Sequence, residues 1–226
     1  MSIVSDETLQ KFKDEGLLED DSLSLAQFNL LLGVLLLYGF LINAGECYLL
    51  SRFSKVFPDF GLGYTSLLVY IVFALIGMFL IRKKAGSISL FLGYNCFVLP
   101  IGFSVWLVTS GAFLQDIYEA ALLTSFITVT MCVGGTLFPQ FFIRLERFLF
   151  FSLLSFIIAE FVAIFFLGFI SNIWNIIAVG LFSLYIGFDW AVAMARPRTI
   201  KNVLRSAIDL YLDIINIFLS LLRSRK

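Results

Sequence analysis

Seven apolar stretches recur along the chain and are separated by short polar links. Each is close to the roughly 20 residues that an α-helix needs to cross the hydrocarbon core of a membrane. Short links favour antiparallel neighbours in a helix bundle. The pattern therefore predicts an all-α membrane protein. We expect a seven-transmembrane helix bundle over residues 27–226, with spans at 28–50, 64–81, 89–108, 117–138, 148–169, 173–194 and 203–222.

The N-terminal segment 1–26 is acidic, with seven carboxylates against two lysines. It lacks the basic start and small-residue end of a signal peptide, so we expect a solvated tail. Lys and Arg outside the spans number ten on the side of this segment and five on the other. This bias predicts a multi-pass protein of the cell membrane with a cytoplasmic N-terminus and an outer C-terminus. A re-entrant last span would instead return the basic end 223–226 to the cytoplasm.

The last apolar stretch differs from the others because a polar line runs along it. Its members step by three or four residues and so share one face of a helix; they are Ser206, Asp209, Asp213, Asn216 and Ser220. A helix cannot turn such a face to lipid, so we expect this C-terminal helix to be central in the bundle. Hydrogen bonding to neighbouring helices would also account for the line. Two carboxylates on it favour a hydrated or ion-related path.

A third carboxylate, Asp189, lies in the preceding stretch. From a rise of about 1.5 Å per residue, Asp189 lies roughly 8 Å from the cytoplasmic end of its span, Asp209 roughly 10 Å and Asp213 roughly 15 Å. Depth alone therefore pairs Asp189 with Asp209. Two adjacent buried carboxylates cannot both ionise cheaply, so a close pair would make a pH-sensitive switch.

Further acids lie within other spans: Glu160 near the middle of one, and Glu46 and Glu119 near the outer ends of two more. No Lys or Arg falls in the middle of any predicted span. An acid-only interior favours cations over anions, which makes all three glutamates candidates for an ion pathway together with Asp209 and Asn216. For Glu46 and Glu119 an interfacial position is the simpler interpretation. A buried structural hydrogen bond is an equal alternative for Glu160.

Composition excludes several classes of function. With 27 Phe and 60% apolar residues, the chain is not an ordinary soluble domain. The absence of His excludes imidazole pH sensing, His-based catalysis and the common zinc motifs. The three cysteines all fall within apolar spans and suit packing positions better than disulfides or metal sites. We expect no cofactor, no enzymatic activity and no nucleic-acid partner.

Two segments of the chain carry a family resemblance: FSLYIGFD, which ends at Asp189, and LYLDIINIFLSLL over residues 210–222. Together with the 24-residue spacing of Asp189 and Asp213, they resemble the Bax inhibitor family, the transmembrane Bax inhibitor motif proteins with their YccA-like bacterial members. The resemblance implies a seven-helix membrane protein with a pH-sensitive calcium leak. It assigns the roles of pH sensor and gate to Asp189 and Asp213. The same two carboxylates would also bind calcium, the transported ion. It assigns a cationic partner to Arg82, at the end of the second span.

Three other functions compete with a calcium leak. Proton-coupled cation exchange would use the same acids, and the sequence does not separate the two. An intramembrane aspartyl protease also places one Asp on each of two helices, but its second Asp normally follows Gly-x-Gly, whereas Asp213 follows Leu-Tyr-Leu. The family name also suggests an interaction protein that restrains a membrane protease or a cell-death factor. The partners that we expect are calcium ions, protons and the lipid bilayer. The sequence does not identify any membrane protein partner.

Overall fold

The computed structural model describes residues 23–53, 64–81, 86–163 and 172–225, and within them every regular element is a helix. The helices are α2 (Leu25–Phe53), α3 (Tyr64–Leu80), α4 (Ser87–Thr109), α5 (Leu114–Leu137), α6 (Pro139–Arg144), α7 (Glu146–Val162), α8 (Asn172–Ala195) and α9 (Ile200–Arg223). The all-α prediction is confirmed. The acidic segment 1–22 and the basic residues 82–84 lie outside the described residues.

Four of the helices, α2, α4, α5 and α8, are long and apolar enough to cross a membrane. Helices α3 and α7 have 17 residues each and border segments outside the described ranges. Helix α9 has 24 residues but contains two aspartates and several cationic side chains, so its apolar character is lower. The structure therefore supports a multi-pass membrane protein, while the count of seven spans stays a prediction.

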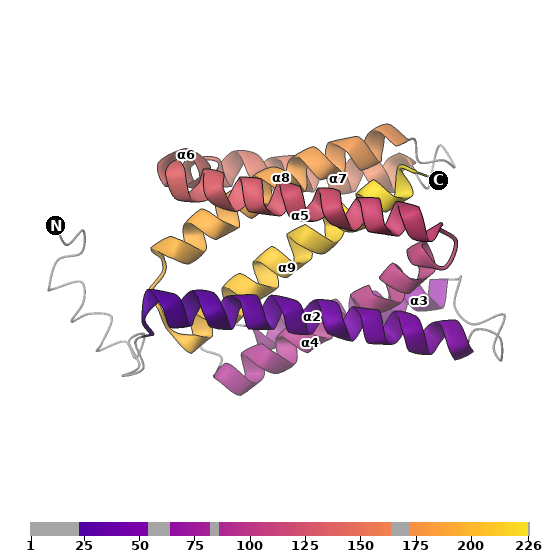
Figure 1. Ribbon diagram of the computed structural model, residues 1–226, viewed down its shortest axis with the longest axis horizontal. Helices are drawn as coiled ribbons and strands as arrows, with labels where there is room; N and C mark the ends of the chain where they lie inside the picture. Colours follow the sequence, from indigo (N-terminus) through magenta and orange to yellow (C-terminus); the bar gives the residue numbers. More distant parts are fainter. Residues whose placement is uncertain (1–22, 54–63, 82–85, 164–171, 226) are drawn as a thin grey trace, which may run out of the picture.

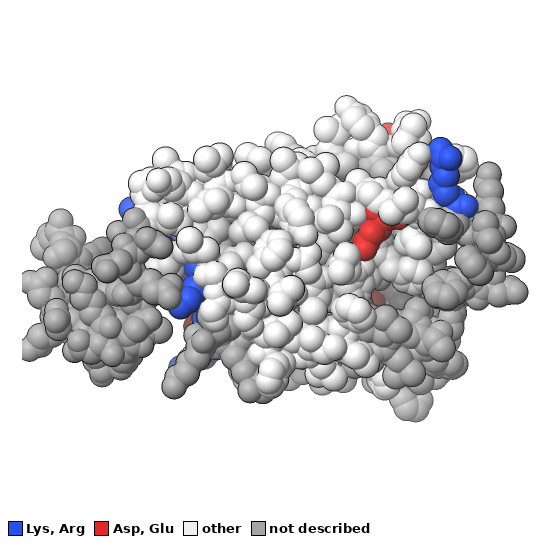
Figure 2. Space-filling model, turned by 90° about the horizontal axis from the view of Figure 1, so that it is seen from below, with Lys and Arg blue, Asp and Glu red and all other residues white. Residues whose placement is uncertain are grey.

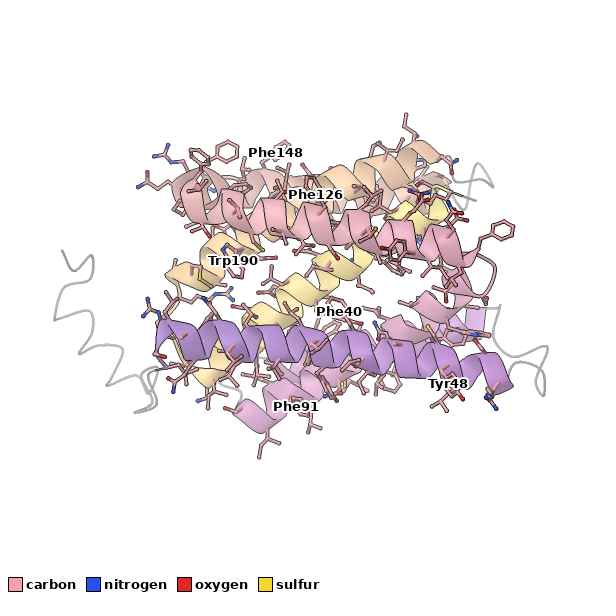
Figure 3. All side chains as sticks on the ribbon, in the orientation of Figure 1. Phe40, Tyr48, Phe91, Phe126, Phe148 and Trp190 are labelled. Atoms are coloured by element: carbon pink, nitrogen blue, oxygen red, sulfur yellow. The ribbon has the colours of Figure 1, made fainter. Side chains whose placement is uncertain are left out.

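Helix α9 lies between two groups of helices, with α2 and α4 on one side and α5 and α8 on the other (Figure 1). It contributes to two apolar clusters. One joins α9 to α8 and the start of α2 and includes Phe28, Ile186 and Leu210. The other joins α9 to α4. Phe40 of α2 points toward α9 (Figure 3), and its ring lies 5.6 Å from that of Tyr211 between centroids. The polar helix is thus enclosed by apolar ones.

The outer surface of the bundle is apolar. Phe126 and Phe148 are 71% and 59% exposed, and their side chains project from the bundle (Figure 3). Most of the face seen in Figure 2 is uncharged: its basic side chains lie toward the two ends, and acidic atoms are visible to the right of its middle. Because exposed phenylalanines would be unfavourable in water over so large an area, this surface suits contact with lipid acyl chains.

Glycines allow α5 and α8 to approach closely. A Cβ added to Gly135 would lie 2.6 Å from the backbone oxygen of Gly187, so the two helices touch through their backbones. Beside this contact, Trp190 Nε1 donates a 2.8 Å hydrogen bond to Thr136 Oγ1. Small residues at such contacts are a common means of packing helices in membranes.

The two prolines within the described helices behave differently. The sequence marks Pro139 as the end of a span, and α5 indeed ends at Leu137. The structure adds the short helix α6, which begins at Pro139 because proline at the first helical position has no N–H to satisfy. Phe142 of α6 is buried against Gly187 of α8. Pro100 lies within α4, which continues on both sides of it.

Candidate functional site

A tight turn joins α8 to α9 and sets how the two helices face each other. Thr199 caps α9 by accepting a 3.3 Å hydrogen bond from the backbone N–H of Asn202, whose side chain donates to the Pro197 carbonyl at 2.7 Å. The backbone N–H of Leu23, just before α2, donates to the Arg198 carbonyl at 2.8 Å. The turn therefore holds the start of α2 and brings α8 and α9 together as antiparallel neighbours.

Three carboxyl groups meet between α8 and α9. Those of Asp189 and Asp213 lie within hydrogen-bonding reach of each other, and Asp209 lies within electrostatic range of both. Asp213 is only 5% exposed, and its Oδ2 atom has no hydrogen-bond partner. Tyr185, one turn before Asp189, lies close to the same two carboxyls. Because two touching carboxylates repel each other strongly in a medium of low dielectric constant, this arrangement requires a proton or a cation between them.

An arginine of the α8–α9 turn, Arg196, lies beside the cluster. Arg196 Nη1 is 3.3 Å from Asp209 Oδ2, and the two side chains are 33% and 37% exposed. The same guanidinium acts electrostatically on Asp189. The depth estimate paired Asp189 with Asp209 and the resemblance paired it with Asp213. The geometry instead joins all three, with Arg196 at the edge nearest the α8–α9 turn. Since Arg196 lies 13 residues before Asp209, across the turn, helical periodicity alone could not reveal the pair.

The polar line of α9 is largely enclosed. Ser206, Asp213 and Ser220 are buried, with at most 6% of any of them exposed. Asn216 is half-buried, and its Nδ2 donates to the Leu212 carbonyl of the same helix at 2.8 Å. Asn216 therefore satisfies its own helix here and does not join the carboxyl cluster. The Ser206 hydroxyl is buried with no hydrogen-bond partner.

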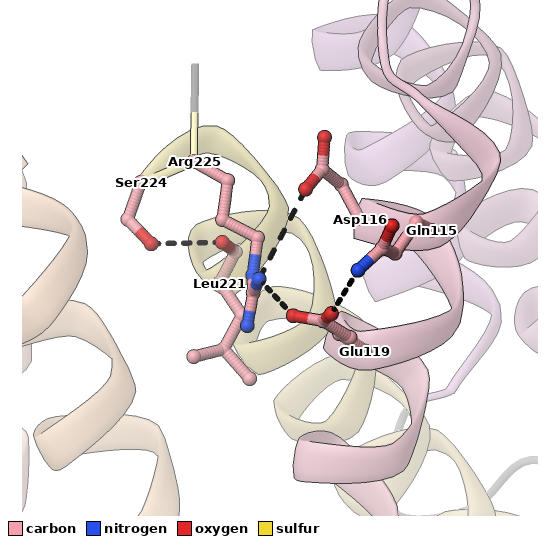
Figure 4. A network of polar contacts seen from close by, with 6 residues as sticks. All are labelled: Gln115, Asp116, Glu119, Leu221, Ser224 and Arg225. Atoms are coloured by element: carbon pink, nitrogen blue, oxygen red, sulfur yellow. Dashed lines mark hydrogen bonds and ion pairs between the residues drawn. The ribbon is translucent and has the colours of Figure 1, made fainter.

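Acids at the opposite end of α9 pair with its terminal arginines. Arg225 contacts the Glu119 carboxylate and lies 3.9 Å from Asp116 Oδ1, while Gln115 donates to Glu119 at 2.9 Å (Figure 4). Glu160 of α7 is half-buried and lies within electrostatic range of Arg223. These glutamates therefore belong to a second charged group, at the far end of α9 from Arg196.

Glu46, near the end of its predicted span, is half-buried. Its Oε2 atom is buried against Gly102 of α4, where the missing side chain leaves room for the carboxyl group. Two polar side chains nearby, Asn43 of α2 and Tyr211 of α9, were not predicted as site residues. Asn43 is 3% exposed, and its Nδ2 donates to the Tyr211 hydroxyl at 2.6 Å.

The last predicted site residue, Arg82, lies outside the described residues. Within the described part of the chain, no three His, Cys, Asp or Glu side chains are grouped in a way that would hold a metal ion. Calcium bound at Asp189 and Asp213 therefore stays a prediction. Calcium normally takes six to eight oxygen ligands, more than these two carboxyls supply.

A model of the family described as "Inhibitor of apoptosis-promoting Bax1" matches residues 24–224, which include every helix above. The chain belongs to the Bax inhibitor family. This confirms the resemblance drawn from the segments around Asp189 and Asp213. No curated protein matches the chain. In this member of the Bax inhibitor family, the enclosed carboxyl cluster lies on the last two helices of the matched region.

Proposed function

We propose that this Bax inhibitor family protein is a pH-sensitive calcium leak channel in which Asp189 and Asp213 act as proton sensor and gate. The observation that carries the proposal is the position of Asp213. The Asp213 carboxyl is buried beside that of Asp189, and its Oδ2 atom has no hydrogen-bond partner. Asp213 belongs to α9, the helix enclosed by the others. A carboxyl pair in such a place costs free energy, which favours a functional role over a structural one.

Protons would act through the charge of this pair. One proton shared by the two carboxyls leaves one negative charge, which the guanidinium of Arg196 attracts at the cytoplasmic edge. The family resemblance adds Arg82 as a further counter-charge for Asp189. When pH falls, a second proton neutralises the pair and the attraction to the arginines is lost. Helices α8 and α9 then separate, and the channel opens.

The open path would follow the polar face of α9. Calcium is a hard cation that binds oxygen, and this face offers the hydroxyls of Ser206 and Ser220 and the amide of Asn216 besides the carboxylates. Acids farther along, Glu119 and Glu160, would receive the ion at the outer end. The absence of Lys and Arg from the middle of the predicted spans would keep the path permissive for cations.

The orientation that we propose has a cytoplasmic N-terminus and an outer C-terminus in the cell membrane. The hydrogen bond from Leu23 to Arg198 supports it, because it keeps the start of α2 on the same side as the basic α8–α9 turn. Tags added at each end should then differ in their access to an impermeant protease in intact cells. Equal access would contradict this orientation.

Calcium flux into proteoliposomes that contain only this protein tests the proposal. Flux down a calcium gradient should increase as pH falls, and Asp213→Asn should flatten this pH profile. Glu146→Gln, which removes an exposed acid at the start of α7, is the control and should keep the profile. An unchanged profile for Asp213→Asn, with normal expression, would remove the aspartate pair from the mechanism.

The same vesicles separate the competing functions. A leak channel dissipates a calcium gradient but cannot build one. Calcium uptake against its gradient, driven by an imposed proton gradient, would instead indicate a proton-coupled exchanger. If no calcium flux is measured under any condition, the remaining candidate function is that of an interaction protein with a membrane partner.

A further inference from the structure

A second unsatisfied carboxyl lies on the other side of α9, between α2 and α4. Glu46 Oε2 is buried and has no hydrogen-bond partner, and the same is true of Asn43 Oδ1, one turn earlier on α2. Both atoms border one point, the position that a side chain on Gly102 would occupy. A Cβ there would overlap the Glu46 carboxyl and lie 3.1 Å from Asn43 Oδ1. Two hydrogen-bond acceptors thus converge at one buried point, and no described side chain donates to either of them.

The direction of the Asn43 side chain follows from its other contact. Its Nδ2 donates to the Tyr211 hydroxyl at 2.6 Å, so its Oδ1 faces away from α9. Tyr211 is fully buried in α9 and packs edge-on against Tyr94 of α4, with 5.6 Å between ring centroids. The three side chains of Glu46, Asn43 and Tyr211 therefore form one polar connection from α2 to α9.

Among the described residues, the charged and titratable neighbours of Glu46 offer no cation that pairs with it. Helix α4 contains no charged residue, and its titratable groups are Tyr94 and Cys96; on α9, Tyr211 faces this side. On α2 itself the neighbours are Cys47, whose thiol contacts Thr109, and Arg52, whose guanidinium donates to Tyr48. Among the described ion pairs, none includes Glu46. An ionised Glu46 would thus carry charge on its buried Oε2 atom with no ionic partner among the described residues, which is unfavourable.

We infer that Glu46 is a second proton-binding site, and that it donates its proton in a hydrogen bond to Asn43 Oδ1. The bond satisfies both unpartnered atoms at once. A metal ion fits less well, because only two free oxygens converge there and calcium requires several more. Turning the Asn43 carboxamide over would let Nδ2 donate to Glu46, but the carboxylate would remain buried without a cation. This inference does not depend on calcium conduction.

The site ties α2 to α9 from the face opposite to Asp213. Loss of the proton would leave a charge between α2 and α4, break the connection to Asn43 and favour separation of α2 from its neighbours. The protein then has one titratable site on each side of its central helix, one shared by two aspartates and one formed by a single glutamate.

Infrared spectroscopy of the purified protein tests the inference, since a protonated carboxyl has its own carbonyl band. At neutral pH the wild-type protein should show such a band, and Glu46→Gln should remove one component of it. Gly102→Ala should remove the same component while retaining Glu46, because the added methyl group occupies the place of the carboxyl. Gly45→Ala, which meets no atom within 4 Å, is the matched control and should retain the component.

The remaining outcomes decide against the inference. A band that Glu46→Gln leaves intact would mean that Glu46 is ionised. Calcium chloride that raises the melting temperature of the wild type but not of Glu46→Gln would mean that the site holds a metal ion. We expect calcium to change both melting temperatures equally. If calcium flux is absent from proteoliposomes while the Glu46 component is present, the proposed channel fails and this inference stands.

Discussion

Arg196 Nη1 lies 3.3 Å from Asp209 Oδ2, across the turn that joins α8 to α9. This ion pair links the α8–α9 turn to Asp209, one member of the carboxyl cluster. Its partners are each about one-third exposed, so solvent reduces its contribution to stability.

A double-mutant cycle measures this pair. Arg196→Ala and Asp209→Asn, singly and together, should give a coupling of about 1 kcal/mol in unfolding experiments in detergent. Arg196→Ala should also increase calcium leak at alkaline pH, since it removes a charge that attracts Asp189. Arg198→Ala, a neighbouring exposed arginine, is the control. Equal leak from both arginine variants would show that only the net charge of the turn matters.

The contact between α5 and α8 makes a prediction about packing. Gly135→Ala should lower the free energy of unfolding by roughly 1–3 kcal/mol, because the new methyl group meets the Gly187 carbonyl, which belongs to the backbone and cannot rotate away. Gly134→Ala is the matched control: its nearest atoms lie at 3.5 Å, so the variant should be neutral or more stable by up to about 1 kcal/mol. Thermal unfolding in detergent compares them. Similar losses in both would mean that the helices are not in close contact.

The charged group in Figure 4 makes a prediction about the end of α9. Arg225→Ala should increase hydrogen exchange in the last turn of α9, because contacts with Glu119 and Asp116 hold that turn against α5. The change in overall stability should stay below about 1 kcal/mol, as is usual for partly exposed pairs. High salt should produce the same increase in the wild type. Unchanged exchange would show that the contacts contribute nothing to order.

Cysteine labelling reports whether the polar face of α9 opens. Ser220 and Leu219 are 6% and 5% exposed, so cysteines at these two positions start from equal burial. In a protein whose native cysteines have been replaced, acidification should increase the reaction of Ser220→Cys with a small aqueous thiol reagent several-fold. Leu219→Cys should not change, because its side chain packs in the apolar cluster with α4. Parallel increases at both positions would indicate general loosening instead of a path along one face.

Hydrophobic periodicity was enough to predict the helical class and the enclosed position of α9. A polar helix face is unfavourable in lipid, so it must face the other helices. The cluster of Asp189 with Asp213 needed the family resemblance, since depth estimates cannot resolve one helical turn. The pairing of Arg196 with Asp209 could not be predicted, because it depends on the conformation of the turn at Pro197. Asn43 and Tyr211 were not predicted because a lone amide and a phenol are common in apolar helices, and only the gap at Gly102 shows why Glu46 is buried beside them.

The enclosed position of α9 has a consequence for biogenesis. It follows every other described helix in the chain, yet it contacts α2, α4, α5 and α8. During synthesis those helices enter the bilayer before their shared partner exists, so the faces that they later turn toward α9 must first meet lipid, water or one another. Placing a helix with two aspartates in lipid alone costs much free energy. The cost is smaller if the helix inserts between helices that already present Tyr94, Asn43 and Asp189. Assembly of the helix bundle should therefore finish with the helix that carries the polar face.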